Sequence, residues 1–191
     1  MSANKTTPPV KAVFLDRDGV VNVDHGYVSR PADFFFAHGA VEGMRLFQNA
    51  GYQLIVITNQ SGIARGFFTE QEYKVLTAHM QDELARAGVH LRGIFHCPHL
   101  PDAVVNDYRK DCDCRKPSPG MILRAAQEHG LDLSQSILVG DKDSDIAAGR
   151  AAGVRTCYLV AVDPTVVPRE SDADGVFSSL QAVASHLFPI V

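Results

Sequence analysis

The chain has 191 residues, of which 46% are hydrophobic and 21% are charged, and its formal net charge is −4. This composition excludes the collagen-like, disordered and disulfide-dense classes of protein, and the charge argues against nucleic acid or an anionic membrane surface as the main partner. No apolar run approaches the roughly 20 residues that span a bilayer, and the polar start of the chain lacks the apolar core of a secretory signal. We therefore expect residues 1–191 to form a single domain of a cytoplasmic, monomeric protein.

Short apolar runs alternate with helical patterns along the whole chain. The first run is Ala12-Val13-Phe14-Leu15, and its lack of polar alternation predicts a strand that is covered on both faces. Similar runs at residues 54–57, 137–139 and 158–160 predict three more strands. Ile94-Phe95 is a weaker candidate for a fifth strand.

The ends of the predicted helices carry recognisable capping residues. Thr69 and Glu72 have the spacing of a capping box, and Gly88 follows as a stop. Ser118 and Pro119 are expected to supply the N-cap and the first position of another helix. The helices are expected over residues 41–50, 69–87, 118–130, 144–152 and 179–187.

This strand–helix alternation predicts an α/β fold with a doubly wound parallel sheet. In such a sheet the ligand binds at the carboxyl ends of the strands. The residues directly after each apolar run are therefore the candidates for function. Two long connections, residues 20–39 and 98–117, are also candidates, because long loops in compact domains are often functional.

Carboxylates and other polar side chains follow three of the predicted strands. Asp16 and Asp18 come after the first run, Thr58 after the run at 54–57, and Asp141 after the run at 137–139. Closely packed carboxylates repel one another, and a bound divalent cation relieves that repulsion. Hard oxygen ligands with open positions favour Mg²⁺. The alternative is that each aspartate only caps a turn or a helix.

The first aspartate pair also fits covalent phosphate chemistry. A carboxylate can act as a nucleophile and form an aspartyl-phosphate, and Asp16 follows its strand directly. Asp18 is placed to protonate a leaving alcohol and then to activate water. A phospho-acceptor receiver domain is the alternative with a similar site, but a base such as Asp18 would hydrolyse the aspartyl-phosphate that carries its signal. The sequence contains no Walker loop and no Gly-x-Ser-x-Gly elbow, which excludes P-loop and α/β-hydrolase chemistry. The chemical motifs run along the chain as Asp16-x-Asp18-Gly19, Thr58, Lys116, and Gly140-Asp141 with Asp145.

These motifs resemble the four motifs of the haloacid dehalogenase superfamily of phosphohydrolases. The resemblance implies a haloacid dehalogenase-like fold without a large cap domain, with Asp16 as the nucleophile and Asp18 as the acid and base. It implies that Thr58 and Lys116 hold the transferring phosphoryl group. It also implies that Mg²⁺ is held by the carboxylates of Asp16 and Asp141 and by the main-chain carbonyl of Asp18.

A second cluster of metal-binding residue types lies in the long connection before residue 117. Cys97-x-His99 is separated by twelve residues from Cys112-x-Cys114. Three thiolates and one imidazole complete a closed, tetrahedral structural Zn²⁺ site. The loop has too few apolar residues to fold by itself, so metal binding would supply its ordering energy. The alternatives are free surface thiols, or His96 in place of His99 as the fourth ligand.

Four segments together, at residues 16–19, 24–27, 58–66 and 112–117, resemble the subgroup of the superfamily that hydrolyses heptose bisphosphates. The histidinol-phosphate phosphatases share these catalytic motifs and the zinc loop, here at about residues 97–114, and are the nearest alternative. A catalytically inactive, zinc-organised binding module is the alternative from another class of function. The resemblance implies a small phosphorylated sugar, a heptose 1,7-bisphosphate, as the substrate. The implied substrate contacts are Asp24, His25, Gly26, Tyr27, Thr58, Asn59, Gln60, Ser61, Arg115, Lys116 and Lys142.

Arg115 has a physical reason to belong to this set. A bisphosphate keeps a second dianion after one phosphoryl group has left, and a planar guanidinium can bind such a group through two hydrogen bonds. Because Arg115 and Lys116 follow Cys114 directly, zinc in the loop is expected to help place both side chains.

Overall fold

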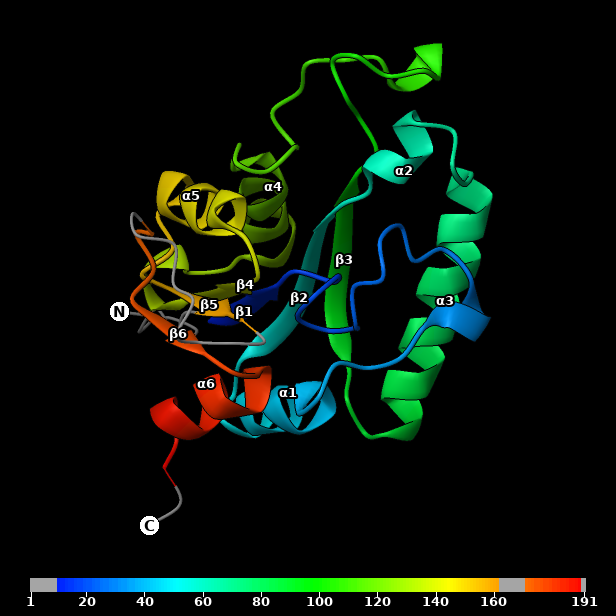
Figure 1. The fold of residues 1–191 in the computed structure, drawn as a ribbon. Coiled ribbons are helices and arrows are strands. Elements are labelled where there is room, and N and C mark those ends of the chain that lie inside the picture. The colour runs from blue at the N-terminus through cyan, green and yellow to red at the C-terminus, as the bar shows by residue number, and fades with distance from the viewer. Residues whose placement is uncertain (1–9, 162–170, 190–191) are drawn as a thin grey trace, which may run out of the picture.

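The computed structural model describes residues 10–161 and 171–189. Its strands are β1 (Ala12–Leu15), β2 (Gln53–Asn59), β3 (Leu91–Cys97), β4 (Ile137–Gly140), β5 (Thr156–Val160) and β6 (Gly175–Phe177). They form one parallel sheet in the order β3-β2-β1-β4-β5-β6 (Figure 1). The order reverses between β1 and β4, and a sheet of this topology opens a ligand-binding crevice at that point.

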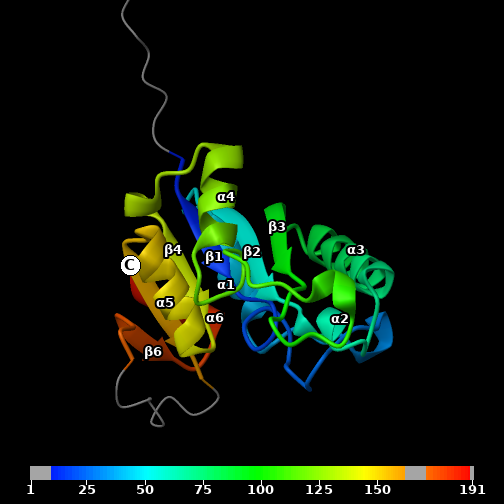
Figure 2. The same ribbon diagram turned by 90° about the horizontal axis from the view of Figure 1, so that it is seen from above.

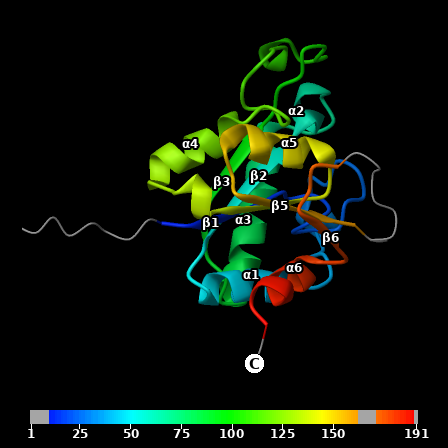
Figure 3. The same ribbon diagram turned by 90° about the vertical axis from the view of Figure 1, so that its left-hand side faces the viewer.

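Helices cover both faces of the sheet, so the fold has three layers. Figure 3 shows the strands between α1 and α6 on one side and α4 and α5 on the other. The helices are α1 (Ala40–Asn49), α2 (Ser61–Ala64), α3 (Glu70–Arg86), α4 (Gly120–His129), α5 (Asp143–Ala152) and α6 (Leu180–Leu187). None of the helices in the described ranges is long and apolar enough to cross a membrane.

The sheet separates two apolar cores. Alternate residues of β1 point to opposite sides: Val13 and Leu15 join the core under α1, α3 and α6, and Ala12 and Phe14 join the core under α4 and α5. All four side chains are fully buried. Burial on both faces explains why the strand sequence shows an unbroken apolar run instead of polar alternation.

The five predicted strands and five predicted helices are all present, but some details differ. Two short elements, α2 and β6, were not expected, because four or three residues are too few to show a helical or strand period. The prediction that Ser118 caps α4 is wrong: Pro119 is the N-cap residue, and no side chain caps this end. Main-chain bonds hold the segment instead, from Ser118 N to Arg115 O (2.8 Å) and from Gly120 N to Asp113 O (2.9 Å).

Neither long connection forms a large cap domain. Residues 20–39 contain the short 3₁₀ helix η1 (Pro31–Asp33), and residues 98–117 contain η2 (Asn106–Tyr108). The second connection rises from the end of β3 and lies beside α2 in both Figure 1 and Figure 2. A main-chain bond from Val105 N to Ala64 O (3.0 Å) joins the two.

The capping box at the start of α3 offers a test of local stability. The Thr69 side chain accepts a hydrogen bond from Glu72 N, and the Glu72 carboxylate accepts one from Thr69 N. We predict that Thr69→Ala lowers the free energy of unfolding by about 0.5–2 kcal/mol in urea titrations, because a helix-end N–H loses its partner. Thr69→Ser keeps the acceptor and should be close to the unsubstituted protein. Equal losses in both variants would contradict this role for the cap.

Candidate active site

The polar residues at the carboxyl ends of β1, β2 and β4 surround a cleft of about 530 Å³. A cavity of this size suits a small, polar metabolite. Most of the predicted site residues border it. The cleft is lined by Asp16, Asp18, Asp24, Gly26, Tyr27, Thr58, Asn59, Gln60, Ser61, Gly62, Arg115, Lys116, Pro117, Lys142, Ser144 and Asp145.

A buried lysine connects two aspartates at the floor of this cleft. The Lys116 ammonium lies 3.0 Å from Asp16 Oδ1 and 2.5 Å from Asp145 Oδ1, and it donates to Ile57 O at 3.0 Å. All three ionic side chains are almost completely buried. Asp16 comes from the end of β1, Asp145 from α5 and Lys116 from the long connection after β3. The fold thus brings together groups that are far apart in the sequence.

The charges in this cluster shift one another's pKa values. Burial raises the pKa of Asp16 to about 7; Lys116 opposes this shift, and Asp145, Asp141 and Asp18 add to it. Burial lowers the pKa of Lys116, but the attraction of Asp16 and Asp145 outweighs burial, and the net shift is upward. Lys116 therefore stays a cation, while Asp16 without a bound cation resists ionisation.

The Asp18 carboxylate is held by several donors. Arg17 donates to Asp18 Oδ1 through Nε (3.1 Å) and to both carboxylate oxygens through Nη2 (2.8 Å each). Asn22 Nδ2 and Gln60 Nε2 each donate at 3.0 Å. Arg17 is itself 1% exposed and also donates to Val28 O, which ties the Asp18 segment to the 20–39 connection. These bonds fix the direction of the Asp18 carboxylate.

The three residues that end β2 and follow it make different contacts. Thr58 is buried, and its hydroxyl oxygen accepts a hydrogen bond from Gln60 Nε2 at 2.8 Å. The same Gln60 nitrogen reaches Asp18, so one amide bridges two predicted catalytic groups. The side-chain amide of Asn59 donates to the main-chain oxygen of Lys116 and accepts from its main-chain nitrogen.

Asp141 sits against the turn that carries the Asp16 motif. Gly19 has a φ of +91°, and a Cβ at that position would lie 2.5 Å from Asp141 Oδ2, so only glycine fits. Lys142 Nζ lies 3.0 Å from Asp141 Oδ2 and 3.7 Å from Asp24 Oδ2. Burial raises the pKa of Asp141, and Lys142 partly opposes this shift.

The carboxylates fit a hard divalent cation. Oxygens of Asp16, Asp141 and Asp145 lie within 4.8 Å of one another. Asp145 is already engaged, by Lys116 at one oxygen and by Lys142 N at the other (3.0 Å). Asp16 and Asp141 are both destabilised as anions by burial, and a cation between them would remove that penalty. The donor set of carboxylate oxygens suits Mg²⁺.

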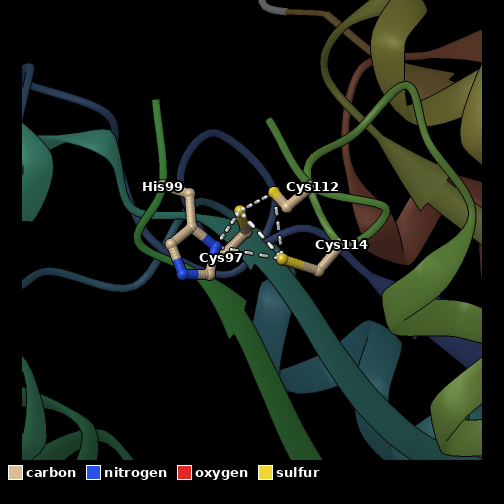
Figure 4. Close-up of side chains that lie close together, drawn as sticks. All are labelled: Cys97, His99, Cys112 and Cys114. Carbon is tan, nitrogen blue, oxygen red and sulfur yellow. Dashed lines mark hydrogen bonds between the residues drawn. The ribbon is translucent and has the colours of Figure 1, made fainter. Parts of the chain in front are cut away.

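The second cluster brings together Cys97, His99, Cys112 and Cys114 (Figure 4). The three sulfur atoms are 3.2–3.5 Å apart, and His99 Nδ1 lies 3.4 Å from Cys114 Sγ and 3.7 Å from Cys97 Sγ. None of these cysteines forms a disulfide. One nitrogen and three sulfur donors around a common centre fit tetrahedral Zn²⁺. His96 lies outside this group and faces Glu70, with Nε2 3.5 Å from Oε1.

Tyr27 and His25 are predicted substrate contacts on the 20–39 connection, and only Tyr27 borders the cleft. Tyr27 borders the cleft with a left-handed backbone (φ 55°), and its ring packs edge-on against Phe67 at 4.7 Å. His25 does not border the cleft; it lines a neighbouring depression with Phe35 and Glu72.

Sequence reasoning missed two parts of this site. The sequence indicates Asp145 only as part of a motif and predicts no role for it, although its carboxylate is the second one that contacts Lys116. The sequence likewise indicates Arg17 only as part of the Asp16 motif, although its guanidinium holds Asp18. The available signal for Arg17 is a charged residue between two aspartates of predicted catalytic role, directly after a buried strand.

Comparisons with known proteins agree with this geometry. A family model described as "HAD-hyrolase-like" matches residues 113–180. The D-glycero-alpha-D-manno-heptose-1,7-bisphosphate 7-phosphatase of Photorhabdus laumondii is 47% identical over 85% of this chain and 89% of its own length. The D-glycero-beta-D-manno-heptose-1,7-bisphosphate 7-phosphatase of Escherichia coli K12 is 48% identical over 90% of each chain.

A solved structure of a relative contains magnesium and phosphate. The D,D-heptose 1,7-bisphosphate phosphatase of B. bronchiseptica, complexed with magnesium and phosphate, superposes with a TM-score of 0.81 and 33% identity. The match covers 93% of this chain and 98% of that chain. The fold and the relatives together define a phosphoric monoester hydrolase of the haloacid dehalogenase superfamily. Within that class, the chain belongs to the family of heptose-1,7-bisphosphate 7-phosphatases.

The raised pKa of Asp16 makes this carboxylate a source of instability in Mg²⁺-free protein. Its folded pKa of about 7 lies above its ordinary value of 3.8, so ionisation costs stability as the pH rises from about 4 to about 7. We predict that Asp16→Asn raises the free energy of unfolding at pH 8 by about 4 kcal/mol and changes it little at pH 4. Urea titrations in Mg²⁺-free buffer measure this difference.

The control for that measurement is Asp82→Asn, which replaces an exposed carboxylate on α3. It should give no comparable gain at pH 8. An Asp16→Asn variant that is less stable than the unsubstituted protein at pH 8 would show that Lys116 needs the Asp16 charge more than burial opposes it.

Proposed function

We propose that the protein hydrolyses the 7-phosphate of D-glycero-D-manno-heptose 1,7-bisphosphate through an aspartyl-phosphate on Asp16. The observation that carries the proposal is the buried contact of Asp16 with Lys116, at 3.0 Å, on the floor of a cleft that Arg115 also borders. One cation is then available for the reacting phosphoryl group and another for a second phosphate. The family membership supports the choice of substrate.

The first half of the reaction is a phosphoryl transfer to the protein. A carboxylate oxygen of Asp16 attacks phosphorus, and the bond from phosphorus to the sugar oxygen breaks. Asp18, in its protonated form, gives its proton to that oxygen, so the sugar leaves as a neutral alcohol. Lys116 and the Thr58 hydroxyl donate to the phosphoryl oxygens, where negative charge must be stabilised.

The second half returns Asp16 to its starting state. Asp18 is now a carboxylate and takes a proton from a water molecule, whose oxygen attacks phosphorus. The bond between phosphorus and Asp16 breaks, inorganic phosphate leaves, and Asp18 is protonated again. Arg17 and Gln60 both donate to Asp18 Oδ2, so one of these hydrogen bonds must open when that oxygen carries the proton.

Two metal ions complete the proposal. Asp16, Asp141 and the main-chain carbonyl of Asp18 would hold Mg²⁺, which supplies charge neutralisation for the phosphoryl group when bound. Cys97, His99, Cys112 and Cys114 would hold Zn²⁺, which orders the connection after β3. In the B. bronchiseptica relative the structure contains magnesium and phosphate together.

The remaining parts of the proposal concern context. The substrate is a small phosphorylated sugar, and the product serves the synthesis of nucleotide-activated heptose for lipopolysaccharide. The chain acts as one phosphatase domain, as a monomer, in the cytoplasm. Asp24, Gly26, Tyr27, Ser61 and Lys142, which border the cleft, contact the sugar and its phosphates.

The substrate assignment is tested through Arg115. One charge-assisted hydrogen bond contributes roughly 1.5–3 kcal/mol, so we predict that Arg115→Ala lowers kcat/KM for the heptose bisphosphate about 10- to 150-fold. The loss on heptose 7-phosphate should be much smaller, because this substrate lacks the second dianion. Initial rates on both anomers of the bisphosphate, on the monophosphate and on histidinol phosphate measure these values.

Arg65→Ala is the matched control, since Arg65 is an exposed arginine that does not border the cleft. It should leave the ratio of bisphosphate to monophosphate rates unchanged. If histidinol phosphate had the higher kcat/KM in the unsubstituted protein, or if Arg115→Ala reduced both sugar substrates equally, the heptose assignment would be wrong.

The zinc proposal has its own test. We predict that Cys112→Ser lowers the zinc content measured by elemental analysis and increases proteolysis within residues 98–117, because a three-ligand site binds the ion more weakly. Turnover of the bisphosphate should fall with the loss of zinc. Cys157→Ser, a buried cysteine outside the cluster, is the control and should retain zinc. Full zinc occupancy in Cys112→Ser would remove Cys112 from the ligand set.

A further inference from the structure

Asn59 holds the main chain of Lys116 with both ends of its side-chain amide. Its Nδ2 donates to Lys116 O at 3.0 Å, and its Oδ1 accepts from Lys116 N at 3.1 Å. The two bonds pair the amide with one residue as a neighbouring strand would. Because Asn59 is the last residue of β2, they fasten Lys116 to the rigid sheet.

The Lys116 side chain is fastened to the same strand. Its ammonium donates to Ile57 O, two residues before Asn59 on β2, at 3.0 Å. The partners Asp16 and Asp145 also lie outside the zinc loop, on β1 and α5. No atom of the four Cys and His ligands takes part in these contacts.

Arg115, the neighbouring residue, is supported from the opposite direction. Its Nη1 contacts the main-chain oxygen of His99 at 3.4 Å, and His99 belongs to the zinc cluster. Within residues 10–161 and 171–189 this is the one hydrogen bond of the Arg115 guanidinium. The two adjacent cations are thus held by different contacts, Lys116 by the side chain of Asn59 and Arg115 by the main chain of His99.

We propose that Asn59 is a positioning residue that locks Lys116 to β2 and makes its placement independent of the zinc loop. Zinc then governs Arg115, and through it the preference for a second phosphate, whereas Asn59 governs the phosphoryl chemistry. This inference rests on the proposed function for the roles of Lys116 and Arg115. It differs from the sequence-based expectations that Asn59 contacts the substrate and that zinc places both cations.

The test compares Asn59→Ala with the unsubstituted protein, using p-nitrophenyl phosphate as the substrate. Loss of the two hydrogen bonds from Asn59, the clamp on Lys116, lets Lys116 shift from the transferring phosphoryl group. A misplacement of about 1 Å can reduce a rate about 100-fold. We expect kcat to fall about 10- to 100-fold. Orthovanadate adopts the five-coordinate geometry of the transferring phosphoryl group. Its inhibition constant should rise about tenfold, and the inhibition constant of inorganic phosphate should rise less.

These inhibition constants separate positioning from a loss of folded protein. A variant that is partly unfolded has fewer active molecules and a lower apparent kcat, but the remaining active molecules keep their inhibition constants.

Asn59→Asp provides a second variant of the same size: it can still accept from Lys116 N, but its other oxygen faces Lys116 O and repels it. We expect the same changes in kcat and in vanadate inhibition. Asn49→Ala, at an exposed position on α1, is the control.

The zinc arm of the experiment uses Cys112→Ser with the same assays. Asn59→Ala should keep its zinc and leave the ratio of bisphosphate to monophosphate kcat/KM unchanged. Cys112→Ser should show the reverse: a lower ratio, with vanadate inhibition and p-nitrophenyl phosphate turnover changed less than threefold.

Three outcomes would overturn the inference. Folded Asn59→Ala and Asn59→Asp with normal kcat and vanadate inhibition would remove the positioning role. Loss of zinc from Asn59→Ala would show that the clamp and the zinc loop are one unit. A reduced bisphosphate preference in Asn59→Ala would make Asn59 a substrate contact. Failure of the unsubstituted protein to hydrolyse the heptose bisphosphate would refute the proposed substrate only, because the p-nitrophenyl phosphate and vanadate measurements do not depend on it.

Discussion

The buried ammonium of Lys116 is the group on which the rest of the site depends. Removing an ion from water costs several kcal/mol, and a buried ion is tolerated only with well-placed partners of opposite charge. Here Asp145 supplies the opposite charge at 2.5 Å, and Asp16 Oδ1 and Ile57 O complete the contacts. These partners come from β1, α5 and β2, so the strand order must place the end of β1 between those of β2 and β4. The site is therefore complete only when the sheet and α5 have come together.

The charge balance of the cluster favours the binding of a divalent cation. Four carboxylates, on Asp16, Asp18, Asp141 and Asp145, face three cations, on Arg17, Lys116 and Lys142. The excess of negative charge opposes the approach of a phosphate dianion and contributes to the raised pKa of Asp16. A bound divalent cation reverses the sign of the local field, so a dianion is then attracted. On this charge balance, the carboxylate cluster favours binding of the metal ion before the phosphate.

The sequence predicts five of the six strands and the convergence of the aspartates, because both follow from one rule. A parallel sheet needs apolar runs, and it brings the residues after those runs to one edge. Asp16, Thr58 and Asp141 follow that rule. Arg17, Asp145 and Asn59 do not, because their roles depend on which atoms they meet: a carboxylate, an ammonium and a main-chain amide. The Ser118 cap failed for a similar reason, since main-chain bonds from the 113–118 turn occupy that helix end.

The same contacts explain how one short segment can serve two purposes. Cys114, Arg115 and Lys116 are consecutive, yet the first belongs to the zinc cluster, the second contacts the loop main chain at His99, and the third is fixed to β2 and the ion cluster. The proposed phosphoryl transfer needs Lys116 in one position for every substrate, so rigid support from a buried strand suits it. Recognition of the second phosphate needs a group that reaches beyond the reacting centre, and a loop provides that reach. The proposed division of roles thus assigns substrate preference to the loop and the position of the chemical groups to the sheet.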